Sequence, residues 1–160
     1  DESDARALGR TASGVRGINI EENDEVVGMI TYDPTAEDAA AHSILVVSEN
    51  GYGKRSDFDE YRKTNRGGKG VKTLNITEKT GSLVAMKNVT DENDLMIINK
   101  SGLTIRMAVS DIRVAGRATQ GVKLINIKEG DSIAAISAVN KSEEETPVQP
   151  VEQVNEDNNE

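Results

Sequence analysis

The stretch "GRATQGVKLINI" at residues 116–127 occurs in three closely similar forms within this chain of 160 residues. The other two are "GRTASGVRGINI" at residues 9–20 and "NRGGKGVKTLNI" at residues 65–76. We call these three stretches the phrases. A phrase that returns at a regular distance is typical of a repeat fold, in which each copy belongs to one supersecondary unit. The spacing of the phrases therefore decides how the rest of the sequence is interpreted.

The second and third phrases lie 51 residues apart, and the same shift superimposes the segments between them. It places "ILVVSENGYGKRSDFDEYR" (residues 44–62) on "LMIINKSGLTIRMAVSDIR" (residues 95–113). The first phrase lies 56 residues before the second. The longer spacing between the first two phrases is explained by "YDPTAEDAAAH" (residues 32–42), an acidic and alanine-rich insertion. The chain therefore consists of similar units, with one insertion between the first two phrases.

The phrases carry the signals of strands. Residues 71–76 and 122–127 are short, rich in β-branched residues and partly alternating between apolar and polar, which is the pattern of a half-buried strand. A polar turn follows each phrase, and an apolar stretch follows each turn. We predict that these stretches are return strands, at residues 26–30, 83–89 and 133–139.

Further strands are predicted between the phrases. Residues 43–47 and 95–98 are continuous apolar runs, as expected where both faces of a strand are covered. Each run ends in "ENG" or "KSG", a hairpin turn whose glycine takes a positive φ at little steric cost. The strands predicted next, at residues 54–58 and 104–109, complete four strands in about 50 residues, the period of a propeller blade. The sequence therefore predicts an all-β fold of propeller-like blades with four antiparallel strands.

The units define the expected domain organisation. A ring of blades needs typically four or more, so we expect this chain to be the C-terminal end of a longer array. Its last segment has no periodicity and few apolar residues, which indicates a disordered tail. The tail acids could compete with a polyanion for a basic surface, or serve only for solubility. The predicted parts are the end of a preceding blade (1–31), an inter-blade linker (32–42), a full blade (43–92), the last blade (93–139) and the disordered acidic tail (140–160).

Charge is unevenly distributed along the chain. The formal net charge is -9, yet residues 42–128 carry 15 basic and 9 acidic side chains. A basic middle between acidic ends indicates a polyanionic partner, although a solvated surface of mixed charge would also fit. Each phrase repeats a cation at two positions, and a strand end needs no positive charge. These cations could instead pair with neighbouring acids such as Asp57, Glu60 or Asp111.

Several kinds of chemistry find no support in the sequence. The chain has no cysteine and one histidine, His42, which lies in the predicted linker. No apolar run approaches the roughly 20 residues of a membrane span. The near absence of aromatic residues argues against stacking on single-stranded nucleic acid. No nucleophile–base pair or metal cluster is recognisable, so an independent enzyme is not indicated.

The phrases, the stretch "ENGYGKR" and the blade period resemble the C-terminal domain of bacterial DNA gyrase A subunits over residues 5–139. The resemblance implies a β-pinwheel, a six-bladed ring whose neighbouring blades share strands and whose basic rim wraps duplex DNA. This chain would hold the end of the fourth blade, the fifth and sixth blades, and the acidic tail. Two alternatives are the corresponding domain of topoisomerase IV and a propeller-like scaffold for protein interactions.

The resemblance also implies a place in a larger enzyme, the ATP-dependent type II topoisomerase that introduces negative supercoils. Its DNA-cleaving tyrosine lies in an N-terminal region that does not match this chain, and Tyr32, Tyr52 and Tyr61 match nothing catalytic. No cofactor is expected in this segment, since ATP and Mg²⁺ are used by the whole enzyme. Expected partners are double-stranded DNA and the rest of the A subunit, with the B subunit in an A2B2 heterotetramer. The expected location is the bacterial cytoplasm, at the nucleoid, with no membrane contact.

One motif inside the second phrase has a resemblance of its own. "RGGKG" at residues 66–70 is similar to the gyrase box, which marks the first blade of gyrase and is needed there for wrapping. It lacks the preceding glutamine, and "ENGYGKR" places it in a later blade. We interpret it as the ordinary blade turn.

The resemblance and the repeat together predict the DNA-contacting residues. Contacts with phosphates position a duplex without reading its sequence, and affinity falls steeply with salt as counterions are released. The predicted contacts in the phrases are Arg10, Arg16, Arg66, Lys69, Lys72, Arg117 and Lys123. Those in the hairpins are Lys54, Arg55 and Arg106, with Arg62 and Arg113 as weaker candidates.

Overall fold

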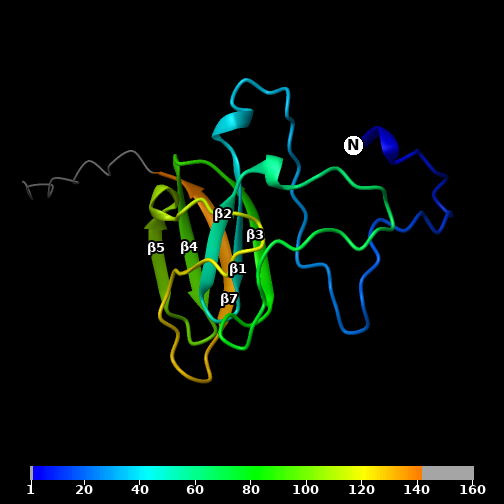
Figure 1. Ribbon diagram of the computed structural model, residues 1–160. Coiled ribbons are helices and arrows are strands. Elements are labelled where there is room, and N and C mark those ends of the chain that lie inside the picture. The colour runs from blue at the N-terminus through cyan, green and yellow to red at the C-terminus, as the bar shows by residue number, and fades with distance from the viewer. Residues whose placement is uncertain (1, 142–160) are drawn as a thin grey trace, which may run out of the picture.

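The computed structural model describes residues 2–141, which form two antiparallel sheets linked by turns and extended segments (Figure 1). Over this range there is no α-helix, and no helix is long and apolar enough to cross a membrane. The all-β class predicted from the sequence is confirmed. The acidic tail, from residue 142 onward, lies outside the described residues. The 3-10 helices are η1 (Glu2–Asp4), η2 (Ala39–Ala41), η3 (Phe58–Glu60) and η4 (Val109–Asp111).

The first sheet has four strands in the order β3-β1-β2-β6. β1 (Ser43–Ser48) and β2 (Tyr52–Ser56) form a hairpin, and β3 (Leu83–Val89) pairs with the other edge of β1. The fourth strand, β6 (Val122–Lys123), comes from the third phrase and pairs antiparallel with β2. One unit therefore completes its sheet with a strand of the unit that follows it.

The second sheet has three strands in the order β5-β4-β7. β4 (Asn93–Asn99) lies in the middle, between β5 (Thr104–Ala108) and β7 (Ile133–Asn140), and pairs antiparallel with both. The described residues provide no strand beside the outer edge of β5. β5 is therefore the open edge of this sheet, at the left of Figure 1.

A shared core holds the two sheets face to face. It contains Leu45 and Val47 of β1, Leu95 and Ile97 of β4 and further buried aliphatic residues from β3, β7, η4 and the third phrase. These side chains are almost fully removed from water, and each buried aliphatic side chain contributes about 1.5–3 kcal/mol from transfer out of water. The core contains no aromatic residue, in agreement with the aliphatic core that the composition requires.

A second, smaller core covers the opposite face of β1. Ile44 and Val46 pack there with Leu74 of the second phrase, and Ile30 and Phe58 pack against them. Since both faces of β1 are covered, all six of its residues are buried. The apolar run at residues 43–47 was predicted to have this environment, and the prediction is confirmed.

Other strand predictions are wrong. Residues 26–30 and 71–76 form no strand, and the strand predicted at 122–127 is reduced to Val122–Lys123. A strand exists only where its backbone finds a partner, and β6 finds β2 of the preceding unit. Residues 71–76 have no such strand partner among the described residues. The prediction that both faces are covered is also wrong for the run at 95–98, because its outer face packs against no sheet of the described residues.

The first phrase and its surroundings lie apart from the two sheets. Residues 3–26 are exposed throughout, and this segment lies beside residues 65–70 at the right of Figure 1. Its apolar side chains Val15, Ile18 and Val26 are 47–66% exposed. It therefore makes the backbone contacts of the repeat without a core of its own.

Candidate nucleic-acid interface

The first and second phrases lie side by side through backbone hydrogen bonds. Asn19 N–H donates to the carbonyl of Gly68 at 2.9 Å, and Gly67 N–H donates to the carbonyl of Gly17 at 2.8 Å. Ile18 and Gly68 form an isolated parallel bridge between these bonds. The contact depends on backbone groups, so it does not require particular side chains.

The second and third phrases are joined in a similar way. Asn75 N–H donates to the carbonyl of Thr119 at 3.1 Å. The guanidinium of Arg117 donates from Nη1 to the carbonyl of Lys72 at 2.7 Å and from Nε to the carbonyl of Glu60 at 3.0 Å. The three phrases therefore form one continuous strip in chain order, which we call the phrase band (residues 9–20, 65–76 and 116–127).

The phrase band is fastened to the sheets where the third phrase crosses β2. Leu124 N–H donates to the carbonyl of Gly51 at 2.8 Å, and Ala115 N–H donates to the carbonyl of Arg55 at 2.8 Å. Gly121 has a φ of +78°, and a Cβ there would lie 2.5 Å from the carbonyl oxygen of Gly53. Glycine is required at this position both for its backbone conformation and for the close approach of the two chains.

Most of the predicted DNA-contacting cations are exposed on the phrase band. Arg10 and Arg16 belong to the first phrase, and Arg16 also reaches the side chain of Asn19 at 3.5 Å. The exposed cations of the band are Arg10, Arg16, Arg66, Lys69, Lys72 and Lys123, and the weaker candidates Arg62 and Arg113 are exposed nearby in sequence. Each phrase thus presents cations to solvent from a backbone joined to that of the next phrase.

Arg117 combines two roles, since its guanidinium makes the contacts with Glu60 and Lys72 while its side chain remains partly exposed. The carboxylate of Glu60 also accepts a hydrogen bond from the Arg117 backbone amide at 3.3 Å. The acid that the sequence offered as an alternative partner is thus in contact with this arginine. Arg117 serves the cohesion of the band as well as its charge.

Two predicted contacts are corrected by the structure, because Lys54 and Arg55 are buried. They are 1% and 7% exposed, respectively. The guanidinium of Arg55 donates to the Asp91 carboxylate at 2.5 Å and to the Ile112 carbonyl at 2.8 Å. Burial lowers the pKa of Lys54 to about 8, so the ammonium form still dominates at neutral pH. A side chain enclosed in this way cannot reach a phosphate from β2, so the prediction is wrong for both residues.

Arg106 lies outside the phrase band. Its Nε is 2.7 Å from the Asp94 carboxylate, across the β4–β5 pair of the last sheet, and its side chain is 45% exposed. It is the repeat equivalent of the buried Arg55. Arg106 was predicted as a hairpin contact, and the structure places it on the last sheet, away from the cations of the phrases.

Lys79 was missed by the sequence prediction. Its Nζ lies 5.4 Å from the centre of the Tyr52 ring, and the Nζ of Lys123 lies 5.9 Å from the same ring. A cation above an aromatic ring is attracted by about 0.5–1 kcal/mol at exposed sites. Lys79 stands in the polar turn "EKTGS", which gives no sign of function in the sequence. The one available signal was Tyr52 itself, a rare aromatic at the start of a hairpin strand.

The tyrosines and the histidine take part in local contacts. Tyr61 Oη is 2.5 Å from Thr73 Oγ1, and the Tyr32 ring stacks on Phe58 with centroids 3.7 Å apart. His42 is hydrogen-bonded to Asn88 and Asp38, and both bonds raise its pKa. Among residues 2–141 no group of three or more His, Asp or Glu residues is placed to hold a metal ion. The phrase band is the part of the described structure that gathers exposed cations at repeated positions.

Comparison with known proteins agrees with this architecture. The family described as "DNA gyrase C-terminal domain, beta-propeller" matches residues 1–33, 42–90 and 93–140. The DNA gyrase A subunit of Staphylococcus epidermidis ATCC 12228 is 48% identical over 143 residues, covering 89% of this chain and 16% of that protein. The corresponding gyrase subunit of Staphylococcus aureus MRSA252 is 45% identical over 159 residues, covering 99% of this chain and 18% of that protein. The chain thus spans less than a fifth of these relatives.

Solved structures give the same result. A DNA gyrase A C-terminal domain superposes with a TM-score of 0.72 at 25% identity, covering 84% of this chain and 44% of that chain. The C-terminal domain of a DNA topoisomerase IV superposes with a TM-score of 0.74 at 24% identity, covering 88% of this chain and 42% of that chain. The likeness to the topoisomerase IV domain shows only a shared fold. The predicted propeller-like blades are confirmed. This chain belongs to the DNA gyrase C-terminal domain family, and the curated relatives named above are A subunits of DNA gyrase, a type II topoisomerase.

Proposed function

We propose that this chain binds and bends duplex DNA along the phrase band, as a wrapping segment of a gyrase A subunit. The observation that carries the proposal is the joining of three similar phrases, each with exposed cations, into one continuous strip. Duplex DNA carries about one negative charge per 1.7 Å along its axis. A strip with cations at repeated positions matches such a regular polyanion better than an isolated basic patch does.

The proposed mechanism is electrostatic and independent of sequence. Contacts between cations and phosphates release counterions and fix the path of the duplex without reading bases. Bending a site of 20–30 base pairs costs on the order of 1–6 kcal/mol, which the contacts distributed along the strip would offset. The proposed contacting residues are Arg10, Arg16, Arg66, Lys69, Lys72 and Lys123, with Arg117 and Lys79 as supporting residues.

The role in the whole enzyme is part of the same proposal. A duplex wrapped by this segment would be presented to the strand-passage core, which uses ATP and Mg²⁺ to introduce negative supercoils. The segment itself would be non-catalytic, and its partners would be the rest of the A subunit, with the B subunit in an A2B2 assembly. This activity belongs in the bacterial cytoplasm, at the nucleoid. The family membership supports these statements, and the geometry of the band supports the DNA contact.

Duplex binding measured across a salt series tests the proposal. We expect the logarithm of the association constant to fall linearly with the logarithm of salt concentration, on duplexes of unrelated sequence. Lys72→Glu or Lys123→Glu should reduce the magnitude of the slope by about 1 each, the effect of losing one phosphate contact. Lys100→Glu is the matched control, because Lys100 is exposed but lies in the β4–β5 turn, outside the phrases.

Four outcomes would count against the proposal. Binding that is insensitive to salt would contradict the electrostatic mechanism, and a preference for one sequence would contradict contact through phosphates alone. Equal effects of Lys100→Glu and Lys72→Glu would show that overall charge, rather than the phrase band, controls binding. Absence of duplex binding together with a stable protein partner would favour an interaction scaffold.

A further inference from the structure

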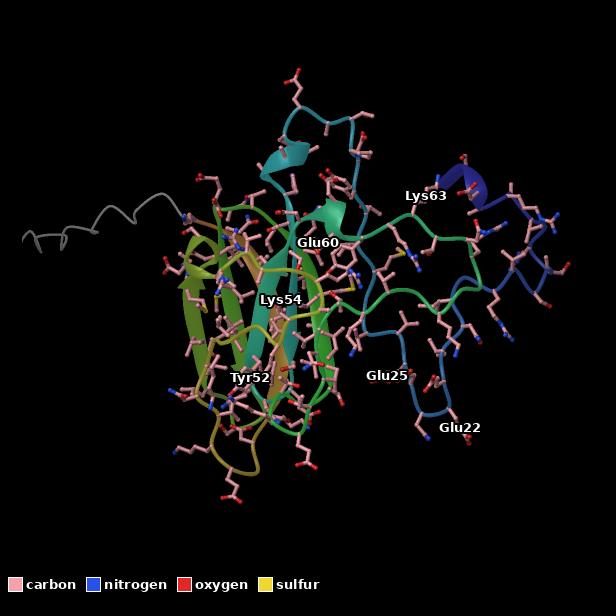
Figure 2. The ribbon with its side chains drawn as sticks, viewed as in Figure 1. Glu22, Glu25, Tyr52, Lys54, Glu60 and Lys63 are labelled. Carbon is pink, nitrogen blue, oxygen red and sulfur yellow. The ribbon has the colours of Figure 1, made fainter. Side chains whose placement is uncertain are left out.

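The buried ammonium group of Lys54 lies inside a loop of the following unit. Residues 113–115 run beside Arg55, the chain then turns, and residues 122–124 return along β2 in the opposite direction. The side chain of Lys54 extends from β2 into this loop (Figure 2). Lys54 is thus enclosed by backbone from a part of the chain that lies more than sixty residues away.

The hydrogen bonds of Lys54 match the donors of an ammonium group. Its Nζ donates to the Gly116 carbonyl at 2.6 Å, to the Arg117 carbonyl at 2.5 Å and to Ser56 Oγ at 3.0 Å. Ser56 Oγ in turn donates to the Ala115 carbonyl at 2.8 Å. An ammonium group has three N–H donors, and each has one acceptor here. Lys54 and Ser56 together therefore hold three consecutive carbonyls of the loop.

The loop at residues 116–121 has few internal constraints, so its conformation also depends on the hydrogen bonds from Lys54. Its sequence "GRATQG" has glycine at both ends, and glycine leaves the backbone conformationally free. Within the loop, the Thr119 amide and hydroxyl donate to the Gly116 carbonyl at 3.2 Å and 2.9 Å. The Gly116 carbonyl is thus the point where the internal bonds and the Lys54 bond meet.

The repeat supplies an independent comparison. With the shift of 51 residues, the stretch at 53–56 is equivalent to residues 104–107 of the last unit, where "GKRS" is replaced by "TIRM". Lys54 corresponds to Ile105, and Ser56 corresponds to Met107. No phrase of the described residues crosses β5. The polar pair is therefore present where a following phrase docks, and apolar residues replace it on β5, beside which the described residues place no phrase.

We propose that Lys54, assisted by Ser56, is a positioning residue that fixes the cation-bearing turn of the following unit for contact with DNA. This inference rests on the proposed function. Lys54 does not touch the duplex, but acts through the residues that its loop carries.

One residue of the loop and one residue that follows it connect Lys54 to the cations of the phrase band. Arg117, whose carbonyl Lys54 binds, extends its guanidinium to the Lys72 carbonyl of the second phrase. Lys123 follows the loop and pairs with Tyr52, two residues before Lys54 on β2. Loosening the loop therefore alters the spacing between Lys72 and Lys123, the two cations on which the binding test depends.

The experiment compares the wild-type chain with Lys54→Met, a substitution that keeps an unbranched apolar stem and removes the donors. Duplex affinity is measured across a salt series, and amide hydrogen exchange is followed by residue. We expect roughly tenfold weaker binding and a salt slope reduced by about 1 to 2. Exchange should become faster at residues 115–124 and remain unchanged in β4, β5 and β7.

Arg55→Met is the matched control. Arg55 is also a buried cation on β2, but its side chain binds Asp91 and Ile112, outside residues 115–124. We expect Arg55→Met to lower stability without accelerating exchange in the loop and without changing the salt slope. An equal change of slope in both variants would overturn the positioning role, since loss of any buried cation would then have the same effect.

Ser56→Ala covers the case in which Lys54→Met does not fold, because it removes only the acceptor of one bond and the donor to Ala115. It should show the same pattern with a smaller amplitude. A folded Lys54→Met chain with wild-type exchange in the loop, or with wild-type affinity and slope, overturns the inference. If the wild-type chain does not bind DNA, the proposed function fails by itself, and the exchange pattern still decides whether Lys54 orders the loop.

Discussion

The two central strands, β1 and β4, are repeat equivalents with different surroundings. All six residues of β1 are buried, whereas burial in β4 alternates along the strand. Both strands carry similar aliphatic runs. The difference arises because β1 lies between two cores, while only one face of β4 meets a neighbouring sheet. Burial of a blade strand is thus decided by how many neighbours its sheet has.

The hairpin strands β2 and β5 differ in the same way. β2 receives β6 of the following unit on its outer edge, and β5 is an edge within the described residues. Gly53 illustrates the consequence, since a Cβ there would lie 2.5 Å from a methyl carbon of Leu124 and 2.7 Å from the Val46 carbonyl oxygen. The equivalent position in β5 is Thr104, which is exposed. A strand that accepts a neighbour requires small and polar residues that an edge strand can omit.

The largest expected effect comes from the two faces of β4. Ile97 is 0% exposed and Ile98 is 39% exposed, so the same residue type can be truncated on both faces. We expect Ile97→Ala to lower the free energy of unfolding by about 3–4 kcal/mol and Ile98→Ala by less than about 1 kcal/mol. Urea unfolding of both variants provides the measurement.

The corresponding pair in β1 sharpens this test. Val46 and Val47 lie on opposite faces of β1, and each is at most 1% exposed. Val46→Ala and Val47→Ala should therefore have similar costs. A large inequality between the two valines would show that the second core does not stabilise β1 as its burial indicates. Equal costs for the two isoleucines would contradict the one-sided burial of β4.

The next effect concerns the hairpin glycines, which are equivalent in the repeat. Gly51 and Gly102 have φ values of +81° and +88°, so alanine meets similar backbone strain at both. A Cβ at Gly51 would lie 2.6 Å from the Ile125 carbonyl oxygen, and a Cβ at Gly102 would have nothing within 4 Å. We expect Gly102→Ala to cost about 1 kcal/mol from backbone strain and Gly51→Ala to cost about 3 kcal/mol in total, since the clash adds to it.

Thermal unfolding of the two glycine variants separates strain from docking. Equal costs would mean that the third phrase yields easily where it crosses β2, and the shared strand would then be a weak connection between the blades. A cost confined to Gly51→Ala would mean that the positive φ itself is tolerated. Equal costs would contradict the explanation given for the difference between β2 and β5, whereas a cost confined to Gly51→Ala would support it.

The smallest effect concerns the connections that lead into the two blades. The insertion before β1 is held by His42, which is hydrogen-bonded to Asn88 at 2.9 Å and to Asp38 at 3.2 Å, whereas a short turn leads into β4. These bonds raise the pKa of His42 above its ordinary 6.5. The stabilisation is therefore complete below pH 6.5 and is lost as the pH rises through the higher pKa of the folded state.

We expect the protonation of His42 to contribute at most about 0.5 kcal/mol to the free energy of unfolding, because the His42–Asp38 pair is partly exposed. The check is the pH dependence of the unfolding free energy of the wild type relative to His42→Gln, from pH 5 to pH 8 in roughly half-unit steps. A difference that grows with rising pH would have the opposite sign to the one expected and would contradict the role of His42 as an anchor of the insertion.

Much of the architecture follows from local patterns that a reader of the sequence can see. The repeat of the phrases, the hairpin glycines and the apolar runs predict the strands of both hairpins and the all-β class, because these features act within a few residues. The exposed cations of the candidate site could also be predicted from the sequence, since their repetition has no obvious structural cause. Lys54 and Arg55 were misassigned because a basic residue beside a turn usually faces water.

Tertiary structure decided what depends on partners far away in the chain. Residues 71–76 and 122–127 have similar sequences, but only the third phrase meets β2 and forms a strand. Lys54 is buried because backbone from residues 116–117 supplies acceptors for its ammonium group. A backbone hydrogen bond or a buried charge is stable only when the partner is present. Local sequence thus specifies the repeating unit, and the contacts between units specify which strands pair, which faces are buried and which cations remain exposed.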